Sequence, residues 1–287
     1  MEVTVDQVKE LRSKTGAGMM DCKKALMESE GNFEKAIEYL RKKGSVTSQK
    51  RSGRVAKEGL IIAKTSDDRK EAVITEVNCE TDFVARSTDF QGFTNSIVDI
   101  LLSTKNDDMN TLLNYQSDGR NIQQALDELT GKVGEKTELK RAQYFKSENG
   151  FFCAYNHVGN KIASIIELSG TLTDEGANLG NDLAMQVVAM KPIVIERSEI
   201  SEDVINKEKE IYLTLALNEK KPQNIAEKIA ENKVEKFFQE NCLVEQEFVK
   251  ESGKSVSDVI KEVSKQVGQD YKVVKMIRYH LGETLES

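Results

Sequence analysis

The sequence predicts an α+β protein: a small three-helix N-terminal domain, then a duplicated sheet-plus-helix core with an inserted antiparallel helical hairpin. Three observations predict it. Short apolar-periodic segments with helix caps fill residues 1–46, and two longer amphipathic segments adjoin within residues 199–241. Between them, a strand–turn–strand–helix pattern occurs twice, at an offset of 91 residues. The length of 287 residues also exceeds that of a typical single domain.

Residues 1–46 should form three short helices on one small core. Thr4, with Gln7 completing a capping box, and Asn32 are the expected N-caps of the first and third helices. We expect Gly44 to end the third helix, because glycine favours the position just after a helix. A unit of this size buries little apolar surface and is marginally stable alone. The expected core residues recur at helical spacing: Val5, Val8, Leu11, Cys22, Ala25, Leu26, Phe33, Ala36, Ile37 and Leu40.

Residues 47–57 are expected to be a flexible basic linker. Residues 1–54 carry 12 Lys or Arg against 8 Asp or Glu, whereas the whole chain has a formal charge of −7. Seven basic residues and no acidic residue lie between Arg41 and Lys57. Such a run can bind nucleic acid, but this one has no interleaved aromatic residues for base stacking. We therefore favour contact with an acidic protein partner and expect no direct contact with nucleic acid.

The core is expected to contain two equivalent halves, residues 58–140 and residues 141–198 with 242–287. The β-branched run Val73–Val77 has a counterpart 91 residues later, which supports a repeated buried strand. Each half reads as strand, turn, strand, connection and helix. A third strand should follow each helix, and Val194–Glu196 is the candidate in the second half.

Residues 199–241 should form the helical hairpin arm. Two helices, Ser201–Asn218 and Pro222–Asn241, are joined by three polar residues, so they should lie antiparallel. After the hairpin, residues 256–267 are amphipathic and residues 273–279 read as a strand. The apolar residues expected on the two helices are Ile200, Val204, Ile211 and Leu215, and Ala226, Ile229 and Phe237.

One connection stands out, the stretch Asn-Cys-Glu-Thr-Asp-Phe-Val-Ala-Arg at residues 78–86. It follows a buried strand and precedes a helix that should start at Thr88, which makes a capping-box pattern with Gln91. On pattern alone, Phe83 should tuck under the connection and Asp82 should be solvated, because most loop phenylalanines are packing residues. The second half has neither residue at the equivalent place. The fold therefore does not require them, which weakens the purely structural interpretation.

The sequence contains no catalytic motif, neither a P-loop nor a nucleophile elbow. The four cysteines are far apart and only two histidines accompany them, so no zinc site is expected. Isolated thiols fit a reducing cytoplasm. The ends show no signal-peptide pattern, and no apolar run approaches the length of a membrane span. We therefore expect a cytoplasmic protein without a cofactor, metal ion or membrane contact of its own.

Two stretches, residues 12–26 and 78–86, closely resemble the two signatures of the bacterial translation elongation factor Ts family, in the same order and separation. Weaker likeness lies at Tyr155–His157, Ala184–Val187 and Ile277–Tyr279, so the resemblance covers essentially the whole chain. The N-terminal helices also resemble the ubiquitin-associated (UBA) domain fold. The hairpin resembles the protruding coiled-coil arm of longer members of the family.

The resemblance implies a guanine-nucleotide exchange factor, not an enzyme, whose partner is elongation factor Tu carrying GDP and Mg²⁺. It also implies that one loop dislodges Mg²⁺ and releases the nucleotide, with the residues Thr81, Asp82, Phe83 and Val84. Arg86 stands where the family often has lysine, and both are cationic. The further residues implied to contact the partner are Met19, Met20, Lys23, Arg86 and His157.

Two alternatives stay open. The UBA-like N-terminal domain (residues 1–46), called the head below, could dock another protein as a binding module without exchange activity. Alternatively, the protein could be an enzyme that uses an unrecognised carboxylate site. The resemblance also leaves open whether the complex with the partner dimerises. Because the chain ends soon after Gly282, we expect no further C-terminal helix of the kind by which some family members contact the partner.

Overall fold

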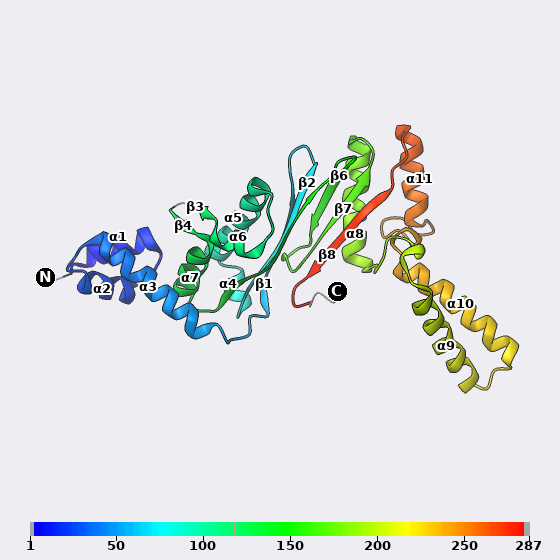
Figure 1. Ribbon diagram of the computed structural model, residues 1–287, viewed down its shortest axis with the longest axis horizontal. Coiled ribbons are helices and arrows are strands. Elements are labelled where there is room, and N and C mark those ends of the chain that lie inside the picture. Colours follow the sequence, from blue (N-terminus) through cyan, green and yellow to red (C-terminus); the bar gives the residue numbers. More distant parts are fainter. Residues whose placement is uncertain (1–2, 118, 284–287) are drawn as a thin grey trace.

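The computed structural model describes residues 3–117 and 119–283, and Figure 1 shows an elongated arrangement. Three helices lie at one end, two sheets lie in the middle, and a helical hairpin lies at the other end. This confirms the α+β class and the predicted order of the parts. The expected first and last domains also include residues 1–2 and 284–287, which lie outside the described residues.

The N-terminal helices pack on one small core, as predicted. Thr4 forms a capping box with Gln7, and Asn32 caps the third helix, which confirms the predicted caps. Val5 is exposed, contrary to prediction, because it lies in the first turn at the edge of the apolar stripe. The helices are α1 (Val5–Thr15), α2 (Met19–Glu28) and α3 (Phe33–Arg51). The buried residues are Val8, Leu11, Cys22, Ala25, Leu26 and Ala36.

The third helix was predicted to end at Gly44, but it continues to Arg51. Gly44 is buried where α3 crosses α7 (Ile122–Val133). A Cβ placed on Gly131 of α7 would lie only 2.9 Å from the Cα of Gly44. Glycine therefore permits close packing of two helices here and does not terminate one. As a result, almost half of the expected 47–57 linker is helical.

Two three-stranded antiparallel sheets form the core, with the orders β1–β2–β5 and β6–β7–β8. Each sheet has a register shift, between Glu76 and Val77 in the first and between Glu167 and Leu168 in the second. These positions are equivalent under the 91-residue offset, so the repeat extends to this irregularity. The strands are β1 (Glu58–Thr65), β2 (Glu71–Cys79), β5 (Thr137–Lys146), β6 (Gly150–Asn156), β7 (Ile162–Ser169) and β8 (Val273–His280).

The third strand of each sheet comes later in the chain than predicted. β5 follows α7 and β8 follows α11 (Val256–Val267). Apart from the short elements and the inserted hairpin, each half therefore has the order strand, strand, helix, helix, strand. Val194, expected in a third strand, forms an isolated bridge to Cys242. The expected border between residues 140 and 141 falls inside β5. The third strand of the first half and the border were both misplaced because β5 pairs with β2, a strand remote in the sequence.

The two sheets pack face to face, and helices cover their outer faces (Figure 1). α5 (Thr88–Thr104) and α7 cover the first sheet, and α8 (Asp174–Met190) and α11 cover the second. A buried ion pair joins Arg141 to Glu76 at 2.7 Å, and the guanidinium lies 3.6 Å from the ring centre of Tyr279. The apolar residues between the sheets are Ile61, Ala63, Ala72, Ile74, Phe152, Ala163, Ile165 and Tyr279.

The hairpin consists of α9 (Glu202–Asn218) and α10 (Gln223–Asn241), as predicted. The predicted inner residues Val204, Ile211 and Leu215 of α9 are nevertheless exposed. The residues one position further along are covered instead, so the contact face is rotated by about 100° from the predicted one.

The remaining elements are short. β3 and β4 form a separate two-stranded sheet. Within the described ranges, no helix is long and apolar enough to cross a membrane. The short elements are α4 (Asp82–Ala85), α6 (Met109–Asn114), β3 (Gln116–Ser117), β4 (Arg120–Asn121), and the 3₁₀ helices η1 (Arg197–Glu199) and η2 (Leu243–Glu245).

Candidate functional site

The connection after β2 is a tight turn followed by a one-turn helix. β2 ends at Cys79, α4 covers Asp82–Ala85, and α5 begins at Thr88. Ser87 is the N-cap of α5, because its side chain accepts a hydrogen bond from the N–H of Phe90. The predicted strand-to-helix connection is therefore confirmed, whereas the predicted cap at Thr88 is wrong by one residue.

Phe83 is 81% exposed on this connection. The prediction that it tucks underneath is therefore wrong. Beside it, Asp82 accepts a charge-assisted hydrogen bond from Arg86 at 2.7 Å. On the inner side, Val84 packs against the core of the first half and Ala85 is buried within it. The short helix thus anchors the connection on one side and exposes the aromatic ring on the other.

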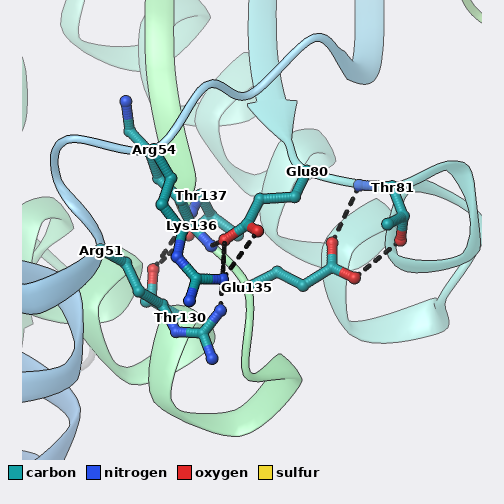
Figure 2. Close-up of polar contacts among 8 residues, drawn as sticks. All are labelled: Arg51, Arg54, Glu80, Thr81, Thr130, Glu135, Lys136 and Thr137. Carbon is teal, nitrogen blue, oxygen red and sulfur yellow. Dashed lines mark hydrogen bonds and ion pairs between the residues drawn. The ribbon is translucent and has the colours of Figure 1, made fainter.

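Two carboxylates join this connection to the turn between α7 and β5 (Figure 2). Glu135 accepts hydrogen bonds from both the N–H and the hydroxyl of Thr81, at 2.9 and 2.7 Å. In the opposite direction, Glu80 accepts a hydrogen bond from the N–H of Lys136 at 2.6 Å. We call these three hydrogen bonds the carboxylate clamp. It fixes the connection to a turn more than 50 residues away in the sequence.

Glu80 also binds two arginines, one at the end of α3 and one just beyond it. Arg51, at the end of α3, lies 3.2 Å from the carboxylate, and Arg54 lies 3.0 Å from it. The hydrogen bond from the Lys136 N–H, assisted by both guanidinium groups, holds the pKa of Glu80 below its usual value. These two basic residues therefore pair within the chain, although the sequence analysis assigned them to a linker facing a partner.

Cys79 lies beneath the connection and is not poised for chemistry. It is fully buried, with its Sγ 3.1 Å from the carbonyl oxygen of Thr81. Burial, and to a lesser extent the charge of Glu135, raises the pKa of Cys79 to about 12, so it stays a neutral thiol at physiological pH. Among the residues that the structure describes, no group of three His, Cys, Asp or Glu side chains could hold a metal ion.

The other predicted contact residues lie on separate parts of the molecule. Met19, Met20 and Lys23 lie in the first half of α2, and Met20 is 75% exposed. His157 is exposed in the turn between β6 and β7, where its Nδ1 lies 3.2 Å from the hydroxyl of Tyr155. The head lies at one end of the molecule (Figure 1), whereas the β6–β7 turn lies against the start of β1: Lys161 pairs with Glu58 at 2.6 Å, and Glu58 lies opposite Cys79 in the sheet. A partner that contacts both the head and the connection must therefore reach from one end of the molecule to its core.

The sequence analysis missed the residues that hold the connection. It singled out Thr81 and Phe83, but Glu135 lies 54 residues from Thr81 in the chain. The available signal was Gly134, which ends α7 in the left-handed conformation at φ 72° and so marks a tight turn beside Glu135. That signal locates the turn but does not say which loop it contacts.

This geometry is typical of proteins that contact another macromolecule. An aromatic side chain is exposed on a firmly held connection, and the adjacent thiol is buried and neutral. The predicted contact residues are spread over the molecule and do not converge in one cleft. Such an arrangement suits recognition of a protein surface.

Comparison with known proteins identifies the family. The family model described as Elongation factor TS matches residues 80–283. A relative named Elongation factor Ts from Chlorobium phaeobacteroides (strain BS1) is 47% identical over 285 residues, which cover 98% of this chain and 99% of the relative. Proteins of the same name from Chloroherpeton thalassium and Clostridium botulinum are 44% and 41% identical, covering 98% and 99% of this chain and 99% and 94% of their own. The chain belongs to the elongation factor Ts family, which confirms the resemblance and places it in translation elongation.

Proposed function

We propose that this protein is a guanine-nucleotide exchange factor for elongation factor Tu and acts by binding, not as an enzyme. Membership of the elongation factor Ts family supports the general role. The observation that carries the finer proposal is the exposure of Phe83 within the family signature. An exposed phenylalanine forgoes the free energy of burial in its own protein, so it suits burial in a partner.

The loop Thr81–Val84 would act on the Mg²⁺ and phosphate site of the partner. GTPases hold nucleotide phosphates with P-loop amides and a coordinated Mg²⁺. Phe83 would enter between helices of the partner and shift the elements that position the Mg²⁺. Asp82 would compete for hydrogen-bond donors that hold the closed form of the partner. Breaking its surface ion pair with Arg86 for this purpose costs little free energy. By linkage, a protein that prefers the nucleotide-free partner weakens nucleotide binding by the same factor.

Burial of Phe83 does not suffice for the whole effect. Complete burial of this side chain stabilises a complex by roughly 1.5–3 kcal/mol. A thousandfold acceleration of nucleotide release needs about 4 kcal/mol. We therefore propose that Met19, Met20 and Lys23 of the head, together with His157, hold the partner while the loop acts.

The proposal assigns no cofactor to this chain, because the GDP and Mg²⁺ belong to the partner. We place its action in the cytoplasm, without a membrane and without direct contact to nucleic acid. The pairing of Arg51 and Arg54 with Glu80 supports the last point, since it reduces the positive charge available to phosphates. Measuring the mass of the complex in solution would decide whether it dimerises.

Release of a fluorescent GDP analogue from elongation factor Tu tests the proposal. The wild type should accelerate release strongly, while Phe83→Ala and Asp82→Ala should form the complex but release GDP more slowly at saturation. Val249→Ala, which truncates another exposed apolar side chain, is the matched control and should behave as the wild type. No acceleration by the wild type would refute the exchange function and favour a binding module. Full acceleration by both loop variants would refute the loop mechanism alone.

A further inference from the structure

We infer that Glu135 is a positioning residue for nucleotide exchange, because its carboxylate fixes the direction in which Phe83 is exposed. This inference rests on the proposed loop mechanism. α4 contains four residues, and a helix of that length is not stable through its own hydrogen bonds. Neighbouring groups must therefore impose its conformation.

Glu135 acts at the residue where α4 begins. Figure 2 shows its side chain reaching from the α7–β5 turn to Thr81, the N-cap of α4. The backbone N–H and the hydroxyl of Thr81 donate to different oxygens of the carboxylate, at 2.9 and 2.7 Å. Two charge-assisted hydrogen bonds to one group fix both the backbone and the side chain of Thr81. Phe83 follows two residues later, so its direction depends on that of Thr81.

The carboxylate can impose this geometry because its own position is fixed. Gly134 ends α7 immediately before Glu135, and Lys136, immediately after it, donates its N–H within the carboxylate clamp. The hydroxyls of Thr130 in α7 and Thr137 in β5 form a buried hydrogen bond of 2.7 Å across the same turn. Glu135 therefore stands between two elements that are tied to each other as well as to the connection.

The second half of the core offers a comparison within the same chain. Gly268 ends α11 as Gly134 ends α7, and the next residue, Gln269, accepts a hydrogen bond from the N–H of Thr171 at 2.9 Å. Bracing of the loop after the second strand is thus a property of both halves. Only in the first half of the repeat does an Asp-Phe pair directly follow the braced threonine, and there a carboxylate accepts from both the N–H and the hydroxyl of Thr81.

The test is the rate of GDP release from elongation factor Tu as a function of the concentration of each full-length variant. Glu135→Ala should lower the rate at saturation on the order of tenfold, because a charged hydrogen-bond acceptor is removed. The half-saturating concentration should change by less than about twofold, since the binding surfaces remain. Glu135→Gln keeps one acceptor oxygen and should give an intermediate rate. Gln269→Ala, the matched control in the second half, should keep the wild-type rate at saturation.

A double variant distinguishes a positioning role of Glu135 from a purely structural one. If Glu135 acts through Phe83, the double variant Phe83→Ala/Glu135→Ala should release GDP no more slowly than Phe83→Ala. Additive losses, an equal loss in Gln269→Ala, or a higher half-saturating concentration with an unchanged saturated rate would overturn the inference. Amide hydrogen exchange at Thr81 gives a readout without the partner: it should be faster in Glu135→Ala, and an unchanged rate overturns the inference.

The failure of the inference can be distinguished from the failure of the proposed function. If Phe83→Ala releases GDP slowly while Glu135→Ala matches the wild type, the loop mechanism stands and the positioning role is refuted. If Phe83→Ala matches the wild type, the loop mechanism is refuted. Any loss in Glu135→Ala would then arise by another route, and the positioning role would be refuted with it.

Discussion

The same substitution, phenylalanine to alanine, should have opposite consequences at two positions of this chain. Phe83 is 81% exposed on the connection, whereas Phe152 is fully buried between the two sheets. About a fifth of the surface of Phe83 is covered, so Phe83→Ala should lower the free energy of unfolding by about 0.3–0.6 kcal/mol. Phe152→Ala loses its whole burial and leaves a cavity, which typically costs about 3–5 kcal/mol.

Two assays separate these consequences. Urea unfolding followed by circular dichroism measures stability, and release of fluorescent GDP from elongation factor Tu measures exchange. Phe83→Ala should unfold near the wild-type midpoint but release GDP slowly, while Phe152→Ala should unfold much earlier yet exchange normally per folded molecule. A loss of more than about 1 kcal/mol in Phe83→Ala would show that the ring is packed on its own protein and would refute the reasoning. A fully stable Phe152→Ala would refute the assignment of a core between the sheets.

Three further predictions concern stability, measured by urea unfolding. Glu76→Ala should lower the free energy of unfolding by about 3–5 kcal/mol, because it leaves the buried guanidinium of Arg141 without its carboxylate. A loss below about 1 kcal/mol would contradict this. Gly131→Val should cost about 1–3 kcal/mol through the clash with Gly44, whereas Gly92→Ala, which has open space around it, should be neutral or stabilising. The lowered pKa of Glu80 means that its contribution is complete above the usual glutamate pKa of about 4.3 and is lost as the pH falls through the folded value. Wild type and Glu80→Gln should therefore differ at pH 7 and converge as the pH falls through the lowered pKa of folded Glu80, and a constant difference would contradict the role of the carboxylate.

Local interactions made part of the fold predictable. The caps at Thr4 and Asn32 each use a side chain and a backbone N–H three residues apart, so the sequence alone contains both partners. Gly44 was misinterpreted because glycine serves both at helix ends and at close helix crossings, and the second helix of the crossing lies far away in the chain. The third strands were misplaced for the same reason, since their pairing partners are remote in the sequence.

The candidate site was predictable in its location but not in its structure. The signature around Asp82 located the connection, and the repeat showed that the fold does not require its residues. The general preference of phenylalanine for the interior gave the wrong environment for Phe83, which is exposed on the connection. Glu135 could not be predicted, since its role depends on how a distant turn meets this connection.

The helix α3 packs in both the head and the core. Its 19 residues span about 28 Å, from Phe33 in the core of the head to Arg51 at the carboxylate of Glu80. The tight crossing at Gly44 lies between them and is a natural fulcrum, with lever arms of about 16 Å toward the head and about 10 Å toward Glu80. A tilt that moves the head by about 3 Å would move Arg51 by about 2 Å in the opposite direction, given rigid arms of these lengths. A displacement of that size is comparable with the distance range of a hydrogen bond, so a tilt of α3 would disturb the 3.2 Å contact between Arg51 and Glu80 and with it one of the groups that hold the connection.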